Sequence, residues 1–440
     1  MRILIFLGFI LLITSFFLFL IPSDQAIPEA ESILLLGATL MVAYLFGRFI
    51  NRFRLPKITG YLLTGIIIGP DVLNILSQRN VTDLQLIDNV ALSLIALTAG
   101  GEFALNKVKK QLKLIVSVTL WQIVIVLLGI SLTVMVFSPL IPFLRGQTFS
   151  TLLGVSLVFG VLAVAKSPAT TIAIISETRS RGPFTNFILG ITILKDIIIV
   201  LLFALVLALT LPLISETATL QLHYVQRVFI EILMSLGLGV IAGLFIYFYL
   251  RYIEMDFFLF LFSLILLVIE VSHMLHLELI LIFMMAGFVV QNFTRFGNAL
   301  LHTIEQSSLP VYVTFFAIAG ASLKISIFLQ NWLFTLILVT ARMFTTHLGT
   351  WVGSHLADGS SHVKRYGWMG FIGQAGLTLG LSIILEKELP PPLGTNIKTI
   401  IVAAIAINQI VGPVLFRYSL WKSGEIPEEK SPSPETVRSS

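Results

Sequence analysis

Apolar runs long enough to cross a membrane recur along almost the whole of this chain. Residues 188–205, for example, read ILGITILKDIIIVLLFAL, and about 20 apolar residues let a helix span the hydrocarbon core of a bilayer. The composition agrees, because 57% of the 440 residues are hydrophobic and only 12% are charged, with a mean hydropathy of +0.98. These values exclude an ordinary soluble domain. Since a helix satisfies its own backbone hydrogen bonds in lipid, the sequence predicts an all-α polytopic membrane protein.

The apolar segments number fourteen, and we expect each of them to form one membrane helix. They are residues 3–21, 31–50, 57–77, 85–106, 112–138, 149–176, 184–213, 226–250, 255–273, 277–293, 308–326, 331–356, 366–386 and 395–416. The first segment follows Arg2 and precedes PSDQA, so residues 1–30 form either an extra N-terminal helix or a signal segment. The length of the run favours a retained helix, and the expected count is 13–14 helices. Residues 422–440 are polar and contain proline, which predicts a disordered cytoplasmic tail.

Basic residues in the loops predict the orientation of the chain. If the helices alternate from a cytoplasmic N-terminus, nineteen of the 28 Lys and Arg residues lie in cytoplasmic segments and six in outer loops. The positive-inside rule therefore places both termini in the cytoplasm, and we expect a plasma (inner) membrane location. Because the basic loop residues explain the net charge of +5, this charge does not indicate a nucleic-acid partner. Because the chain has no cysteine, disulfides and thiolate metal sites are excluded.

Four charged residues remain inside the expected membrane helices. They are Lys166, Lys195, Asp196 and Arg342. Each such charge costs about 2.5–3.5 kcal/mol on insertion scales when it lies at the bilayer centre, and charged residues at this depth generally mark a functional site. Adjacent helical positions do not face each other, so Lys195 and Asp196 cannot simply pair. The sequence therefore predicts a functional site near the middle of the membrane.

Internal similarity indicates two copies of a five-helix unit. The order and spacing of three short matches are kept between the two halves of the chain. The matches are 61–69 with 283–291, 97–105 with 317–325, and 191–199 with 404–412. The first copy starts at the inner face and the second at the outer face, so the repeat is inverted, and inverted repeats place binding sites at interrupted helices near the midplane.

Two of the expected helices carry residues that interrupt a helix. In the segment 149–176, Lys166 and Ser167 precede Pro168, which removes a backbone donor and frees carbonyl groups. The repeat counterpart is GFIGQAGLTLG, in which glycines surround Gln374. Glycines at this spacing are also typical of closely packed helices. We expect both segments to be interrupted and to cross in mid-membrane.

Several of these motifs together resemble the monovalent cation:proton antiporters, most closely the cation:proton antiporter-2 branch. The resemblance covers residues 31–418. It is based on the motifs RLPKITGYLLTGIIIGP, AGGEFAL, AVAKSPATT, Lys195-Asp196, VTARMFTTHLG and GQAG. It implies a homodimer that exchanges H⁺ for Na⁺ or K⁺ by an elevator-type movement. It also implies an antiporter membrane domain over 31–421, with scaffold and dimer helices at about 31–106 and 255–326 and core helices at about 112–213 and 331–418.

The resemblance also implies roles for individual residues. The ion-carrying carboxylate is Asp196, and Lys195, Lys166, Ser167 and Thr170 belong to the same ion- and proton-binding site. The supporting core residues are Arg342, Gln374 and Pro168. No cofactor is expected, and the only metal is a monovalent cation near Asp196. A dehydrated carboxylate can hold either a proton or a cation, and that competition is the exchange.

Two departures from the family pattern keep other functions open. Lys195 and Lys166 stand where the family usually has neutral or acidic residues. Either one lysine is neutral, or a lysine pairs with Asp196 when the ion is absent, or the substrate is not a cation. The alternatives are an anion or other solute carrier on the same fold, and a transport-inactive sensor or assembly subunit. An enzyme is not indicated, since no nucleophile–base pair is present.

Several residues also have simpler structural interpretations. Lys195 and Asp196 could fix the register of a helix, and Arg342 is more typical of a structural anchor than of a substrate ligand. Glu270 and Glu278 lie in or beside outer helix ends, and a place on the ion path is one interpretation of them.

Overall fold

The computed structural model describes residues 28–427 apart from 54, 215–221, 254, 308, 324–331 and 375. Within these residues the secondary structure is entirely helical. The α-helices are α2 (Pro28–Asn51), α3 (Lys57–Ile68), α4 (Gln78–Asp83), α5 (Gln85–Glu102), α6 (Leu105–Val108), α7 (Leu112–Phe137), α8 (Phe149–Val164), α9 (Pro168–Thr178), α10 (Pro183–Ile214), α11 (Leu222–Tyr252), α12 (Phe257–Leu275), α13 (Leu279–Phe293), α14 (Gly297–Ser307), α15 (Leu309–Ala321), α17 (Trp332–Leu356), α18 (Ser361–Tyr366), α19 (Gly376–Glu388) and α20 (Leu393–Lys422). Short 3₁₀ turns are η1 (Lys109–Gln111), η2 (Ser138–Leu140), η3 (Pro142–Leu144) and η4 (Gly367–Phe371).

The helices confirm a polytopic membrane protein. In the described part of the chain, eight helical spans are long and apolar enough to cross a membrane, and α3, α13 and α15 are shorter apolar helices. Each expected segment from residue 31 onward contains a helix, whereas the segment 3–21 and residues 428–440 of the tail lie outside the described residues. One segment is shorter than expected: α3 ends at Ile68 rather than residue 77, because Gly69 is extended and precedes Pro70. A residue before proline is disfavoured in the α-helical region.

The packing of the helices follows the inverted repeat. Helix α3 packs on α15 while α5 packs on α13, and α7 packs on α17. In the repeat, α3 corresponds to α13, α5 to α15 and α7 to α17. The α3–α15 pair therefore corresponds to the α13–α5 pair, and the α7–α17 pair corresponds to itself. Equivalent glycines of the two copies lie at equivalent helix contacts. A Cβ on Gly65 would lie 1.8 Å from the Ala317 carbonyl oxygen, and one on its repeat equivalent Gly287 would lie 2.2 Å from the Leu97 carbonyl oxygen. Only glycine permits such close backbone approach between helices.

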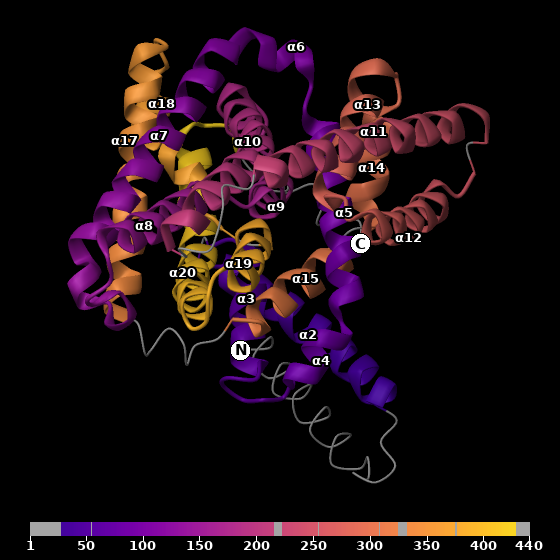
Figure 1. Cartoon of the computed structure of the whole chain (residues 1–440). Coiled ribbons are helices and arrows are strands. Elements are labelled where there is room, and N and C mark those ends of the chain that lie inside the picture. Colours follow the sequence, from indigo (N-terminus) through magenta and orange to yellow (C-terminus); the bar gives the residue numbers. More distant parts are fainter. Residues whose placement is uncertain are drawn as a thin grey trace.

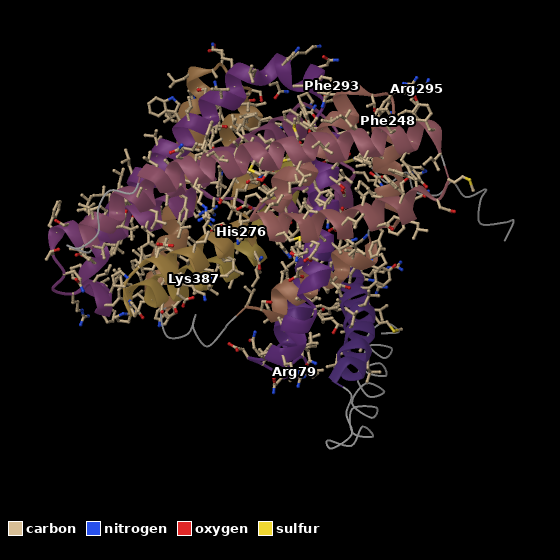
Figure 2. The ribbon with its side chains drawn as sticks, turned by 45° about the vertical axis from the view of Figure 1, so that its right-hand side comes forward. Arg79, Phe248, His276, Phe293, Arg295 and Lys387 are labelled. Atoms are coloured by element: carbon tan, nitrogen blue, oxygen red, sulfur yellow. The ribbon has the colours of Figure 1, made fainter. Side chains whose placement is uncertain are left out.

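Two groups of helices lie at opposite ends of the molecule. Helices α7, α8, α17 and α18 gather at one end, and α12, α13 and α14 at the other (Figure 1). Figure 2 shows Arg79 near the lower end of the ribbon and Arg295 near its top. Phe248 and Phe293 are exposed apolar side chains, as on a surface that faces lipid.

Carboxylates hold the amino-terminal ends of two helices. Glu177 accepts hydrogen bonds from the Lys57 amide at 2.7 and 3.0 Å, at the start of α3. Glu425 accepts from the Phe184 and Thr185 amides, both at 2.7 Å, at the start of α10. Both contacts satisfy free amide groups and favour the helix dipole. The second contact fixes the end of the helix that carries Lys195 and Asp196.

Candidate functional site

Two interrupted helices cross inside the protein, as the sequence predicts. The first interruption lies between α8 and α9, and the second between η4 and α19. The Ser167 amide donates to the Gly373 carbonyl oxygen at 2.9 Å and joins the two extended stretches. The Ser167 hydroxyl accepts from the Thr170 amide at 3.1 Å, and Pro168 occupies the first turn of α9. Ser167, Pro168 and Thr170 therefore act together as the start signal of the second half-helix.

Arg342 on α17 anchors the carboxyl ends of both interrupted stretches. Its guanidinium donates to the carbonyl oxygens of Ala163 at 2.8 Å and Ala165 at 3.0 Å. It also donates to those of Ile372 at 2.7 Å and Phe371 at 3.1 Å. Helix carboxyl ends carry partial negative charge and free carbonyls, so a buried guanidinium is well matched to them. The geometry favours the anchor role of Arg342 over a role as a ligand.

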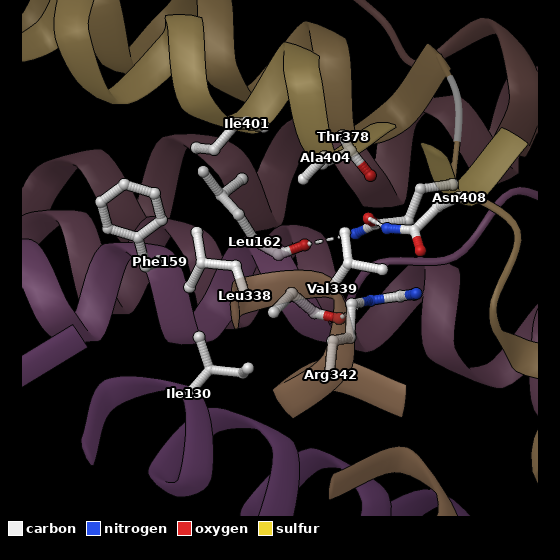
Figure 3. Close-up of a pocket in the computed structure, with 12 residues that line it drawn as sticks. Ile130, Phe159, Leu162, Leu338, Val339, Arg342, Thr378, Ile401, Ala404 and Asn408 are labelled. Carbon is white, nitrogen blue, oxygen red and sulfur yellow. Dashed lines mark hydrogen bonds between the residues drawn. The ribbon is translucent and has the colours of Figure 1, made fainter. Parts of the chain in front are cut away.

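Gln374 holds the crossing from the other chain segment. Its amide nitrogen donates to the carbonyl oxygens of Leu162 at 3.1 Å and Ala165 at 3.2 Å, and its oxygen accepts from Asn408 at 2.8 Å. A cavity of about 30 Å³ lies beside these groups, with Arg342, Thr378 and Asn408 among its polar lining residues (Figure 3). Apart from these three residues and Gln374 its lining is apolar, and none of Lys166, Lys195 and Asp196 lines it. The cavity therefore belongs to the supporting side of the crossing.

Lys195 on α10 is held by neutral groups. It is 3% exposed, and its ammonium donates to the Gln122 side-chain oxygen on α7 at 2.7 Å. The Gln122 amide nitrogen in turn donates to the Thr350 hydroxyl on α17 at 2.6 Å. This chain of hydrogen bonds holds the Lys195 ammonium to α7 and α17 through uncharged side chains. Gln122 was missed by the sequence analysis, although it is an isolated polar residue in the apolar run 112–138.

Lys166 has a similar environment at the interruption. It is 1% exposed, and its ammonium donates to the Thr192 hydroxyl on α10. The ammonium lies 4.9 Å from the centroid of the Phe371 ring, and the Lys195 ammonium lies 5.7 Å from the same centroid. Both lysines thus share one aromatic ring and gain cation–π attraction from it.

Asp196 differs from all of these charged groups. It is 3% exposed, and neither carboxylate oxygen has a hydrogen-bond partner among the described residues. Lys166 and Lys195 lie within electrostatic range of it, yet neither forms an ion pair with it in the described structure. Buried polar atoms are nearly always hydrogen-bonded, so an unpartnered carboxylate requires an explanation. The simplest one is a group prepared to bind a proton or another positively charged ligand.

Known proteins match both the sequence and the fold. Residues 33–421 match the transmembrane sodium/hydrogen exchanger family. A Na⁺/H⁺ antiporter of Enterococcus hirae is 22% identical over 390 residues, which are 86% of this chain and 96% of that protein. A probable Na⁺/H⁺ antiporter 3 of Methanocaldococcus jannaschii is 27% identical over 175 residues, 39% of this chain and 40% of that protein.

Solved structures of the sodium proton antiporter MjNhaP1 from Methanocaldococcus jannaschii share the fold. One has a TM-score of 0.70 at 18% identity and covers 93% of this chain and 100% of that one. Another, at pH 8, has a TM-score of 0.64 at 17% identity and covers 90% and 98%. The family match extends over most of the chain and includes both interrupted helices, which confirms the resemblance found in the sequence. The chain is an integral membrane protein and belongs to the sodium/hydrogen exchanger family.

Proposed function

We propose that this protein is a secondary antiporter that exchanges protons for a monovalent cation, Na⁺ or K⁺, and that Asp196 carries both. The observation that supports this most directly is the Asp196 carboxylate, which is buried beside the crossing and has no hydrogen-bond partner among the described residues. The relatives named as Na⁺/H⁺ antiporters supply the substrate class.

The chemistry of exchange follows from competition for one carboxylate. A proton neutralises Asp196, and a desolvated cation compensates its charge, but the two cannot be held together. Because an uncompensated charge is costly in a low-dielectric interior, the site moves across the barrier only when loaded. Ser167 and Thr170, at the start of α9, supply neutral oxygens for the cation. The Thr170 hydroxyl donates to the Ser167 hydroxyl at 3.1 Å and keeps its own lone pairs.

The two lysines have an active role in this proposal. Their hydrogen bonds to Gln122 and Thr192 hold both ammonium groups near Asp196 without an ion pair. A small movement of one side chain would bring it to Asp196 when no cation is bound. When the substrate cation enters, the tethered lysine releases its proton to the aqueous side and leaves Asp196 as a neutral amine. One proton then leaves for one cation, and exchange is electroneutral.

Alternating access is proposed to be of the elevator type. The core, about 112–213 and 331–418, contains the crossing and moves against a scaffold of about 31–106 and 255–326. The close glycine contacts between α3 and α15 and between α5 and α13 support a rigid scaffold. We propose that the scaffold also forms a homodimer, and that both termini lie in the cytoplasm of a plasma (inner) membrane.

The decisive experiment measures cation-driven proton movement in everted vesicles with a pH-sensitive dye. Na⁺, K⁺ and Li⁺ are added in turn to vesicles with the unaltered protein and with Asp196→Asn. We expect the variant to fold and to lose cation-driven flux entirely. Asp358→Asn is the matched control, because the Asp358 side chain is 89% exposed and its loss should leave the flux unchanged. Full activity of Asp196→Asn would remove Asp196 as the carrier.

The excess of buried positive charge favours one second candidate, an anion or other solute carrier. Lys166, Lys195 and Arg342 are all buried, against the single acid Asp196 at the same crossing. The same vesicles separate the two candidates, because an anion carrier would move protons in response to an anion gradient and not to cation addition. A transport-inactive sensor or assembly subunit would respond to neither.

A further inference from the structure

A second carboxylate without a partner among the described residues lies at the start of α13, in the opposite group of helices. Glu278 immediately precedes α13, and its amide donates to the Ser235 hydroxyl on α11 at 3.0 Å. Its side chain is half-buried. Among the described residues no hydrogen bond or ion pair to the Glu278 carboxylate is found. An acid in such a place, without a structural partner, needs a reason to be there.

The first turns of α13 and the start of the half-helix α9 border the same small cavity. Ile280 and Met284 of α13 line a small cavity together with Pro168 and Ala169, which begin α9. Glu278 is therefore two residues from a side chain that borders the crossing. The charges of Glu278 and Asp196 lie within electrostatic range of each other. The start of α13 thus carries a carboxylate within electrostatic range of Asp196, on a helix outside the expected core.

The surrounding charges single out Glu278 among the nearby acids. Glu231 on α11 also lies within electrostatic range of Glu278, but it is paired with Arg227 at 2.8 Å. Glu270 on α12 is exposed. Glu278 alone of these three combines partial burial, no ion pair in the described structure, and electrostatic contact with Asp196.

We propose that Glu278 is a receiving carboxylate for the substrate cation on the outer side, which binds the cation before it reaches Asp196 and sets its affinity from that side. This inference rests on the proposed function. A cation between two carboxylates relieves their mutual repulsion, so the pair attracts a monovalent cation more strongly than Asp196 does alone. Glu278 belongs to the expected scaffold, so this contribution ends when the core moves away. The affinity gain is therefore specific to one face.

The test measures the KM for Na⁺ or K⁺ separately at each face, in right-side-out and everted vesicles, for Glu278→Gln, Glu278→Asp and Glu270→Gln. For Glu278→Gln we expect an outer-face KM raised roughly five-fold or more, the lower end of measured coupling between sites. The maximal rate and the inner-face KM should stay close to those of the unaltered protein. Glu278→Asp, which keeps the charge, should give an intermediate outer-face KM. Glu270→Gln, the exposed control, should change neither.

An unchanged outer-face KM in Glu278→Gln would overturn the proposal, as would an equal rise at both faces. If Glu278→Gln does not fold, Glu278→Ala takes its place, and an unchanged outer-face KM in that variant has the same consequence. The outcome is distinguishable from failure of the proposed function. An active Asp196→Asn refutes Asp196 as the carrier, whereas an inactive Asp196→Asn with a normal Glu278→Gln refutes the role of Glu278 alone.

Discussion

Replacing Arg342 by methionine tests whether the crossing depends on the guanidinium or merely tolerates it. Methionine keeps much of the side-chain volume and removes every donor. The guanidinium makes four hydrogen bonds, to the carbonyl oxygens of Ala163, Ala165, Phe371 and Ile372. Arg342→Met therefore leaves four carbonyl groups at two helix ends without their present partner.

The expected loss of stability can be bounded from these contacts. Hydrogen bonds between side chains in membrane proteins average about 0.6 kcal/mol, with higher values for single cases. Bonds to charged groups contribute about 1.5–3 kcal/mol each in soluble proteins. Four such bonds that act as a unit are not additive, so we expect Arg342→Met to lower the free energy of unfolding by roughly 2–6 kcal/mol.

The assay is unfolding of the purified protein in mixed micelles by titration with SDS, followed by circular dichroism. Arg145→Met is the matched control, because the exposed Arg145 donates to only one carbonyl oxygen, that of Pro139, at 2.7 Å. The control should lose less than about 1 kcal/mol, as expected for one exposed contact. A free energy of unfolding for Arg342→Met equal to that of the control would refute the anchor role. Loss of transport with unchanged stability would instead make Arg342 part of the ion path.

Two further predictions concern the crossing and its lysines. In Gly412→Ala the new Cβ would lie 2.6 Å from both Cα and N of Gly373. Because the backbone must shift to accept it, we expect transport in vesicles to fall at least about ten-fold. In the control Gly380→Ala the new Cβ meets nothing within 4 Å, so transport should be normal. Lys195→Gln and Lys166→Gln separate the two tethered-cation candidates, and the responsible one should shift the pH profile or cation affinity of exchange while keeping a measurable flux. Unchanged profiles and affinities in both would leave the lysines structural, and dependence of the unaltered flux on membrane potential would refute electroneutral exchange.

The helices and their interruption could be predicted from the sequence because they depend on local chemistry. Pro168 lacks an amide donor and its ring clashes with the preceding turn, so together with the capping Ser167 it favours the start of a new helix. The apolar runs specify membrane helices by length alone. The inverted repeat was visible because its two copies kept glycines where their backbones touch, as at Gly65 and Gly287.

The hydrogen-bond partners of the buried charges could not be predicted from the sequence, because they come from remote parts of the chain. Gln122 is 73 residues from Lys195, and the carbonyl oxygens that bind Arg342 come from segments on both sides of it. No periodicity connects such groups, and only the tertiary packing brings them together. The proximity of Glu278 to Asp196 has the same origin. It follows from the tertiary arrangement that brings the first turns of α13 and the start of α9 to one cavity, rather than from any motif.

Adjacent placement of Lys195 and Asp196 in the middle of α10 has a geometric consequence. Successive residues of a helix point about 100° apart, so one helix presents these two charges to different neighbours. Lys195 donates to the side-chain oxygen of Gln122, which itself donates to Thr350, and its ammonium lies 5.7 Å from the centroid of the Phe371 ring, so its partners among the described residues are neutral. Asp196 receives no hydrogen bond from the described residues, although it is equally buried. The lysine therefore contributes positive potential without occupying the carboxylate. A cation that binds Asp196 therefore takes a position that no described residue fills, and its gain is the attraction of the carboxylate less the repulsion of the nearby lysines.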